Sequence, residues 1–595
     1  MNPAEAVDRA VARLGNEPTQ LLAILRAVQD SLGCLPAEAL DRVAAKVPLT
    51  RAEVEATASF YHLLHQAPHG AYEVLFSDNI IDQMAGKADL MRYFCDELLV
   101  EPGKQSEDGL VYVDSTSDIG LADQAPGALV NGMLVPSLDR NRLDLMANLI
   151  REQRPFAQWP AMLFEVPDNV RKAGPLLGEP FQPGAGLRRA IAAGPDAILA
   201  ELDAASLRGR GGAGYKTAAK WGSCRKAQGA AHHVICNADE GEPGTFKDRV
   251  LLASHADLVF EGMTVAARVL GAKQGLVYLR GEYRCLLQRL ETGLTRRRAT
   301  GLLGKAILGV EGFDFDIRVV LGAGAYVCGE ETALIESLEG KPGRPRNRPP
   351  YPDTHGYLGQ PSVVNNVETY ACAARILERG GAWFAGLGTP QSTGTKLLSV
   401  SGDCKRPGVY EYPFGVTLRQ VLADCGALQP QAAQVGGPSG TCVPWRDFER
   451  RIAFEDVPSA GALMIFSRSR DMFDVARNFT HFFAHESCGF CTPCRVGTSI
   501  LRNTMDKLAA GKGSALDMAH MQALMRVMLS MSHCGLGHTA ANPVVQTMRA
   551  FPEAFERRLR NLSYEPSFDL DAALETARLI TRRDDEWAHI VREET

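Results

Sequence analysis

A glycine-rich, basic loop constrains the fold of this chain more than any other feature. The stretch 207–221 reads LRGRGGAGYKTAAKW, with four glycines, two arginines and two lysines in fifteen residues. Glycine lets a backbone approach a ligand closely, and successive free N–H groups in such a loop form a cradle for anions. The loop therefore predicts a site for a phosphate-bearing cofactor.

An ordinary dinucleotide fingerprint is a weaker interpretation of the same loop. Gly209, Gly211 and Gly214 fit the G-x-G-x-x-G spacing, but that fingerprint must follow a strand directly. The preceding run 197–205 has a helical pattern instead. A flexible surface loop is the other alternative, and the alternation of glycine with positive charge disfavours it.

Length and charge exclude several classes of protein. A chain of 595 residues is too long for one core, and a net charge of −6 argues against a nucleic-acid partner. No apolar run approaches the ~18 residues of a membrane span, and the N-terminus lacks a signal-peptide pattern. We expect a cytoplasmic protein, in which fourteen cysteines invite a search for metal ligands.

Four of those cysteines have the spacing of an iron–sulfur site. Cys488, Cys491 and Cys494 form a C-x2-C-x2-C turn, and Cys534 follows at a distance in SHCGLG. Three neighbouring thiolates and one remote thiolate are typical of a [4Fe–4S] cluster. Zinc is the competing metal, because four thiolates also suit its tetrahedral coordination.

Two further loops carry polar groups suited to a cofactor. CNADEGEPGTFKDR at 236–249 follows a predicted strand, and its Asn237, Asp239 and Glu242 offer acceptors for ribityl or ribose hydroxyls. A polar turn that caps a helix is the alternative for this loop. LGAGAYVCGEETAL at 321–334 is a glycine-rich turn that opens into a helix, whose first N–H groups can face a phosphate.

The pattern along the chain predicts a multidomain α/β protein. Helical periodicity dominates the first 68 residues, alternating strands and helices follow, and the last part is helical, with helices expected over 251–270, 501–508, 519–531 and 543–559. The expected domains are a helical arm (1–70), a small α/β domain (71–150), a Pro/Gly-rich linker (151–190), a larger α/β domain (191–395), a β-rich domain (396–470) and a helical domain with the cysteines (471–595).

Four motifs in order resemble one known family. The loops at 207, 236 and 321, together with VNNVET at 364–369, are similar to the flavoprotein subunit of NADH dehydrogenases, the NADH-oxidising subunit of respiratory complex I. The resemblance implies FMN and NAD(H) at one site and a [4Fe–4S] cluster on the four cysteines. The cofactor residues that it implies are Gly209, Arg210, Gly211, Gly212, Gly214, Tyr215, Lys220, Asn237, Asp239, Glu240, Glu242, Gly329, Glu330, Glu331, Arg348, Tyr351, Asn365 and Asn366.

The same resemblance implies the reaction, and the chain departs from the family at a few positions. Hydride would pass between nicotinamide and flavin, with Glu331 positioning the nicotinamide and Glu242 binding ribose hydroxyls and disfavouring a 2′-phosphate. Tyr215 and Tyr351 stand where the family has Phe, and Arg348 where it has Lys. Gly222-Ser223 stands where a further Phe is usual, so the pattern lacks one aromatic wall for adenine.

The first 150 residues resemble the thioredoxin-like [2Fe–2S] subunit of the same enzymes. That subunit holds its cluster with C-x4-C and C-x3-C, and alignment places Ser77, Asp82, Asp118 and Ala122 at these positions. Alanine cannot ligate iron, so we expect no [2Fe–2S] cluster and a structural or docking role.

The domain layout resembles one member of the family most closely. A fused, cluster-less thioredoxin-like domain is similar to the diaphorase flavoprotein subunit of soluble NAD-reducing [NiFe]-hydrogenases. This resemblance implies an iron–sulfur diaphorase subunit and the large and small hydrogenase subunits as partners. The flavoprotein subunits of complex I and of NAD-dependent formate dehydrogenase are alternatives, and an assembly scaffold is the non-enzymatic one. The β-rich region resembles the ubiquitin-like soluble-ligand-binding β-grasp domain, expected here as a spacer.

Overall fold

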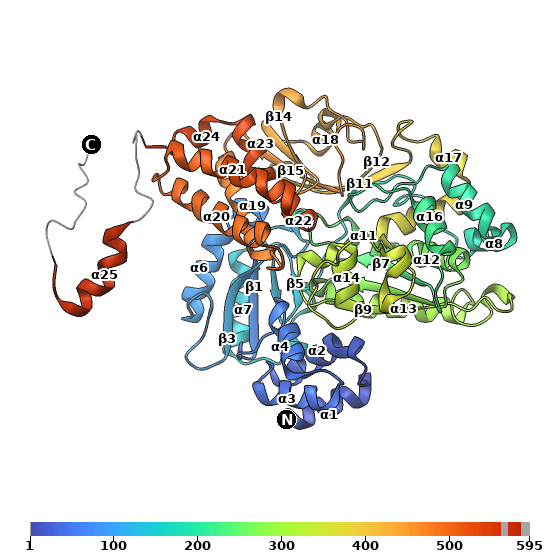
Figure 1. Ribbon diagram of the computed structural model, residues 1–595, viewed down its shortest axis with the longest axis horizontal. Helices are drawn as coiled ribbons and strands as arrows, with labels where there is room; N and C mark the ends of the chain where they lie inside the picture. The colour runs from blue at the N-terminus through green and yellow to red at the C-terminus, as the bar shows by residue number, and fades with distance from the viewer. Residues whose placement is uncertain (1, 561–568, 585–595) are drawn as a thin grey trace.

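The computed structural model of the chain describes residues 2–560 and 569–584. It is a multidomain α/β protein with three separate sheets, as the sequence predicted. Figure 1 shows the blue N-terminal helices at the foot of the molecule and the helices between residues 472 and 556 beside the last sheet at its top. Parts of the expected 471–595 domain, residues 561–568 and 585–595, lie outside the described residues.

Four helices form the N-terminal arm: α1 (Pro3–Leu14), α2 (Leu21–Leu32), α3 (Ala37–Lys46) and α4 (Arg51–Phe60). Capping boxes start two of them, Asn2 with Glu5 on α1 and Thr50 with Glu53 on α4. The arm is attached to the larger α/β domain by two backbone hydrogen bonds, each 3.0 Å long. The N–H of His62 donates to the carbonyl of Gly324, and the N–H of Leu63 donates to the carbonyl of Ala323.

The small α/β domain is built on a five-stranded sheet of order β2-β3-β1-β4-β5. Its strands are β1 (Tyr72–Ser77), β2 (Lys104–Gln105), β3 (Val111–Thr116), β4 (Ala128–Val130) and β5 (Met133–Val135), and its helices are α5 (Ile80–Met84), α6 (Lys87–Leu98) and α7 (Arg140–Arg151). Val74 and Phe76 alternate along β1, so both contact the core that also buries Phe94 of α6 and Leu143 of α7.

The larger α/β domain has a parallel sheet of order β10-β7-β8-β9, formed by β7 (His233–Ala238), β8 (Gln274–Leu279), β9 (Asp316–Leu321) and β10 (Ser362–Asn366). Its helices are α8 (Ala185–Ala193), α9 (Pro195–Ala204), α10 (Thr217–Lys226), α11 (Lys247–Ser254), α12 (Ala256–Leu270), α13 (Leu287–Ala299), α14 (Glu331–Leu338), α15 (Pro352–His355), α16 (Val367–Arg379) and α17 (Gly381–Ala385).

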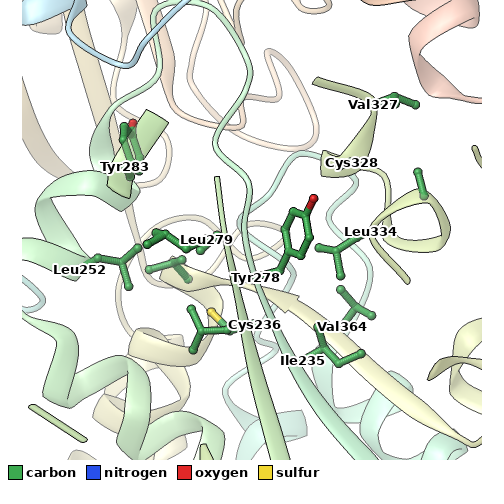
Figure 2. Close-up of a cluster of buried hydrophobic side chains, with 14 of the residues drawn as sticks. Ile235, Cys236, Leu252, Tyr278, Leu279, Tyr283, Val327, Cys328, Leu334 and Val364 are labelled. Carbon is green, nitrogen blue, oxygen red and sulfur yellow. The ribbon is translucent and has the colours of Figure 1, made fainter. Parts of the chain in front are cut away.

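Apolar side chains cover this sheet, as expected for parallel strands. In Figure 2, Ile235 and Cys236 of β7, Tyr278 and Leu279 of β8 and Val364 of β10 lie among side chains from the surrounding helices. Because the strands are parallel, their carboxyl ends share one edge. The polar loops that follow β7 and β9 therefore start at the same edge as the end of β10.

The helix expected over 251–270 is wrong as a single element. It is two helices, α11 and α12, with 91° between them at His255. Among the described residues, no single helix is long and apolar enough to cross a bilayer, and only this bent pair meets the criterion when its parts are joined.

The β-rich region forms the third sheet, of order β14-β13-β15-β11-β12-β6. Its elements are β11 (Thr395–Gly402), β12 (Gly408–Pro413), α18 (Leu418–Cys425), β13 (Pro430–Val435), β14 (Thr441–Pro444) and β15 (Ala462–Ser467). Strand β6 (Val170–Lys172) comes from the expected linker and pairs with β12. Glu411 of β12 also accepts the backbone N–H groups of Leu176 and Leu177, so this segment is held in place and is not a free tether.

The C-terminal domain is helical, with α19 (Met472–Glu486), α20 (Thr492–Ala509), α21 (Ala515–Met531), α22 (Gly535–Thr539), α23 (Asn542–Ala550), α24 (Glu553–Glu556) and α25 (Leu570–Thr581). The helix expected over 543–559 is divided into α23 and α24 around Phe551 and Pro552. Pro552 lacks the N–H that a continuous helix requires.

Candidate functional site

A cavity of about 690 Å³ lies where three domains meet. The carboxyl-end loops of the parallel sheet form one wall, the β-rich domain a second and the start of α22 and α23 a third. The lining residues that the sequence predicted are Gly211, Gly212, Asn237, Asp239, Glu240, Glu242, Gly329, Glu330 and Asn366. Polar groups from distant parts of the chain thus converge on one ligand-sized space.

The glycine loop contributes backbone to this cavity. A Cβ added to Gly211 would lie 3.1 Å from the Cβ of Asn366, closer than most real contacts. Gly212 has a φ of +120°, a conformation that residues with a side chain rarely adopt. Glycine at these two positions therefore keeps the floor of the cavity open and lets a ligand approach the main chain.

A buried charge network supports that floor. The ammonium of Lys247 donates to Asp248 at 2.6 Å and lies 3.0 Å from Glu368, while Asn366 donates to Asp248 at 2.7 Å. Burial opposes the charge on Lys247, but the surrounding carboxylates raise its pKa above the usual value. Burial lowers the pKa of neighbouring Lys396 to about 8, and its ammonium also pairs with Glu368.

Three buried side-chain oxygens along the cavity lack hydrogen-bond partners among the described residues. They are Asp239 Oδ2, Thr245 Oγ1 and Glu330 Oε1. Glu330 Oε1 lies 3.4 Å from Arg348 Nη1, an ion-pair distance without a hydrogen bond. Because buried polar atoms are normally satisfied, these oxygens fit a ligand rich in hydroxyl groups. Burial raises the pKa of Asp239 well above its ordinary range.

Glu242 links two walls of the cavity. Its carboxylate accepts the Tyr326 hydroxyl at 2.5 Å and both the N–H and the hydroxyl of Ser439, at 2.9 and 2.6 Å. A side chain on Gly437 would collide with the side chain of Glu242. The β-rich domain therefore closes over this carboxylate.

Several predicted site residues do not line the cavity. The guanidinium of Arg210 is buried and donates to the carbonyls of Arg208, Thr393 and Thr395, so it clips the loop to the start of β11. Asn365 accepts the indole N–H of Trp221 at 2.8 Å. The remaining residues outside the lining are Gly209, Gly214, Tyr215, Lys220, Glu331, Arg348 and Tyr351.

Some of these outer residues support the site from behind, and others are exposed. Lys220 donates to Glu331 at 2.8 Å, which engages the carboxylate that was expected to position nicotinamide. Tyr215 and Tyr351 are 60% and 55% exposed, unusual for large aromatic side chains. They remain candidates for a ligand that extends beyond the cavity.

The sequence reasoning missed some of the lining. Lys247 and Asp248 lie in the quoted motif CNADEGEPGTFKDR and could have been chosen from it. The wall from the β-rich domain, which includes Ser439 and Ser459, had no sequence signal, because its position depends on tertiary packing. The β-rich domain, which we expected to act only as a spacer, therefore also forms part of the cavity wall.

The four cysteines surround a second, smaller cavity with Pro345, Phe490, His533 and Leu536. Zinc at about 2.3 Å from each sulfur would bring thiolates to about 3.8 Å from one another. Among the described residues, no three of these cysteines have sulfurs all within 4.8 Å of one another. The wider spacing favours a cluster over a single zinc ion.

Cys534 lines both cavities. It stands at the start of α22, with Leu536 also shared by the two linings. A ligand in the large cavity and a metal centre on the cysteines would therefore be separated by one short turn of the chain. This arrangement allows electron transfer between them.

The positions aligned with the [2Fe–2S] ligands form a buried hydrogen-bond network. Ser77 donates to Asp82 at 2.6 Å, and Asp82 also accepts the N–H of Gly127 at 2.9 Å. Asp118 accepts the N–H of Gly120 at 2.9 Å and the side chain of Asn79. Ala122 is buried beside them and offers no ligand atom.

Asp82 predicts a pH-dependent stability. Burial raises its pKa from 3.8 to about 8, so the fold prefers the protonated carboxyl. Its stabilising contribution is full below about pH 4 and is lost as the pH rises towards 8. Asp82→Asn should stabilise the protein more at pH 8 than at pH 5. We expect the change in the free energy of unfolding caused by the substitution to be about 1–3 kcal/mol larger at pH 8. Urea unfolding midpoints at both pH values measure this difference, and Asp89→Asn at an exposed position is the control. If Asp82→Asn shifts the midpoint equally at pH 5 and pH 8, the prediction is wrong.

Four family models match the chain. They are the Nuo51 FMN-binding domain (residues 202–375), the NADH-ubiquinone oxidoreductase-F iron-sulfur binding region (474–558), the thioredoxin-like [2Fe-2S] ferredoxin (7–151) and the SLBB domain (397–443). The first two cover the residues of the large cavity and of the cysteine site in the α/β and helical domains.

Individual relatives extend over most of the chain. The alpha subunit of the NAD-reducing hydrogenase HoxS of Cupriavidus necator is 42% identical over 585 residues, 94% of this chain and 96% of the relative. An NADH-quinone oxidoreductase subunit of Rhizobium meliloti is 40% identical over 61% of this chain and 88% of its own length. A crystal structure of NAD+-reducing [NiFe]-hydrogenase in the H2-reduced state matches with a TM-score of 0.90 at 44% identity, covering 97% of this chain and 100% of that chain.

Proposed function

Because the chain belongs to the family of the alpha subunits of NAD-reducing hydrogenases, we propose that it is the diaphorase flavoprotein subunit of such an enzyme, the subunit that reacts with NAD(H). Hydride would move between NAD(H) and FMN, and single electrons would move between FMN and a [4Fe–4S] cluster. The overall reaction would be H2 + NAD+ = H+ + NADH, with hydrogen chemistry in another subunit.

The observation that carries this proposal is the position of Cys534 between the two cavities. A flavin exchanges two electrons with a nicotinamide and one at a time with a cluster. An electron path needs the two centres close together, and a single turn of the chain provides that closeness. A scaffold without redox function would not require this arrangement.

The residues present fit FMN in the large cavity. Hydroxyls of its ribityl chain match the unsatisfied oxygens of Asp239, Thr245 and Glu330. The phosphate can approach the backbone of Gly211 and Gly212. Among the described lining residues Lys247 is the only lysine or arginine, so positive charge reaches the ligand there. When bound in this cavity, FMN would itself be the group that exchanges hydride with NAD(H).

The contribution of the protein itself is to fix charged groups beside the ligand and to enclose the cavity. Asp248 and Glu368 hold the ammonium of Lys247 in one position, so its charge is already in place and no solvent has to reorganise around it during the reaction. The loop around Ser439 closes on Glu242 and limits access of water from that side.

We propose that NAD(H) enters past Tyr215 and Tyr351, whose exposed rings are free to stack on adenine, and past Arg348, which lies 3.4 Å from Glu330 of the cavity lining. Glu331 would orient nicotinamide from its pair with Lys220.

We propose that the N-terminal domain holds no [2Fe–2S] cluster. The donor atoms of Ser77, Asp82 and Asp118 are already hydrogen-bonded, and Ala122 has none. Within residues 71–150, all of them described, Cys95 is the only cysteine. Electrons therefore leave this chain through Cys488, Cys491, Cys494 and Cys534.

The partners in this proposal are an iron–sulfur diaphorase subunit and the large and small [NiFe]-hydrogenase subunits, and it is supported by relatives that are named as parts of an NAD-reducing hydrogenase. The match to a hydrogenase subunit over nearly the whole chain favours this assembly over complex I, whose relative leaves a large part of the chain unmatched. We further propose that the complex works in the cytoplasm, where the free thiols of the described chain would stay reduced.

The proposal is tested on the purified chain and its complex. We expect one FMN and about four iron atoms per chain, reduction of a dye by NADH, and co-purification of a nickel-containing subunit. A folded chain without flavin and without NADH-dependent dye reduction would support the scaffold instead. A molybdenum-containing partner would replace hydrogenase by formate dehydrogenase.

Glu242→Gln should relax the preference for NADH. The variant keeps the acceptor for the Tyr326 hydroxyl but removes the negative charge that repels a 2′-phosphate. We expect the ratio of kcat/KM for NADPH to that for NADH to rise about tenfold. Steady-state dye reduction with both nucleotides measures it, and an unchanged ratio contradicts the assignment.

A further inference from the structure

A triad of two histidines and one glutamate lies where the helical arm meets the small α/β domain. His65 and His69 belong to the loop between α4 and β1, and Glu73 is the second residue of β1. His65 Nε2 is 2.7 Å and His69 Nδ1 is 2.6 Å from the same oxygen, Oε1 of Glu73. The three ligand atoms all lie within 4.8 Å of one another.

The orientation of His65 distinguishes this triad from a simple hydrogen-bonded pair. Its Nε2 is buried and forms no hydrogen bond with any described residue, although it is close to Glu73. Glu73 Oε1 accepts a hydrogen bond from His69 Nδ1 at 2.6 Å, and a metal ion would take the place of that proton between the ligand atoms. An unsatisfied buried nitrogen otherwise carries a cost.

The surroundings hold the three ligands in place. Gln29 of α2 accepts the backbone N–H of His65 at 2.7 Å and donates to the carbonyl of Leu63 at 2.9 Å. The ring of His69 stacks on Tyr112 at 3.9 Å, and the N–H of Glu73 donates to Asn131 at 2.7 Å. Such fixed ligands reduce the entropy lost when a metal binds.

We propose that His65, His69 and Glu73 bind one divalent transition-metal ion of the zinc type. Two imidazoles and one carboxylate are an established donor set for Zn²⁺, which leaves a fourth position for water. The side chains are 11–17% exposed, which leaves an entry path for the ion.

The bound ion would fasten the arm to the rest of the chain. The loop that carries His65 and His69 begins with His62 and Leu63, whose N–H groups bond to Gly324 and Ala323. These residues precede Tyr326, which lines the large cavity. The ion therefore ties β1 to the segment that braces the glycine-rich turn.

A second triad offers an internal comparison. His62, His485 and Glu486 also have three ligand atoms within 4.8 Å. Glu486, however, already accepts hydrogen bonds from Ser117 and from the N–H of Tyr326 at 3.0 Å, whereas among the described residues the Glu73 carboxylate pairs with its two histidines. With its carboxylate engaged, this triad is the weaker ligand set.

The test uses the full chain with its cluster loaded, so that the four cysteines are occupied. After removal of loose metal and incubation with ZnCl2, we expect about one zinc per chain by elemental analysis. X-ray absorption at zinc should show nitrogen and oxygen ligands at about 2.0–2.1 Å and no sulfur at about 2.3 Å. The apparent melting temperature should rise with zinc.

Variants assign the ion to the triad. His65→Ala and, separately, His69→Gln should weaken zinc binding at least tenfold, while the exposed His520→Ala should not. Two single variants are used so that a folding defect in one, seen by circular dichroism, leaves the other informative. Three results would overturn the proposal: less than about a tenth of an equivalent of zinc in the wild type, sulfur ligation, or zinc lost in His485→Ala but retained in both triad variants.

Discussion

Replacing Cys534 by alanine should abolish electron transfer to the partner subunits while leaving part of the NADH-dependent dye reduction. Alanine has no ligand atom, so the fourth iron of a [4Fe–4S] cluster loses its protein ligand. Since Cys534 lines both cavities, the lost ligand is at the boundary between the proposed flavin and the cluster. We expect a fall of at least about 100-fold in NADH-driven reduction of the partner.

Iron content, the low-temperature electron paramagnetic resonance signal and dye reduction are measured together. Cys442→Ala is the matched control, because both cysteines are 7% exposed and Cys442 is not part of the cluster site. If Cys534→Ala keeps four irons and normal electron transfer to the partner, the cluster does not use this residue and the proposed path is wrong.

Gly211→Val should weaken FMN binding by about 5- to 150-fold. A Cβ at Gly211 would already lie 3.1 Å from Asn366, and the γ-methyl groups of valine would add bulk at this contact between two residues that line the cavity. Overpacking of this kind costs about 1–3 kcal/mol, and every 1.4 kcal/mol is tenfold in affinity. Because Gly211 does not have a positive φ, the backbone itself accepts the side chain.

Flavin fluorescence during titration of the flavin-free chain measures the affinity. Gly222→Ala is the control from the neighbouring helix α10, where an added Cβ would meet only Leu199 at 3.9 Å. Tight FMN binding by Gly211→Val would place the flavin elsewhere in the molecule.

The fold class, the two cofactor regions and the four cysteines were predictable from local signals. Glycine spacing, polar residues at strand ends and the C-x2-C-x2-C turn each arise within a few residues of chain, and each reports a local physical requirement. The absence of cysteine at positions 77, 82, 118 and 122 is likewise visible in the amino-acid sequence without any structure.

Individual roles within the site were less predictable. Arg210 was expected among the residues that hold FMN, yet its guanidinium donates to three carbonyls, because the loop folds back on the start of β11. Glu331 was expected to contact nicotinamide, and the structure pairs it with Lys220 from a helix 111 residues earlier. A motif specifies which residues gather in one region, but not which of them face the ligand.

The sequence by itself determined which chemistry the chain can hold, because glycine flexibility, carboxylate acceptors and thiolate ligands are properties of single residues and short spacings. Only the tertiary structure decided where these parts meet. It brought Ser439 over Glu242, placed Cys534 between two cavities and set His65 and His69 against Glu73. Such contacts join segments far apart in the chain, and their geometry comes from the packing of whole domains, which no local pattern records.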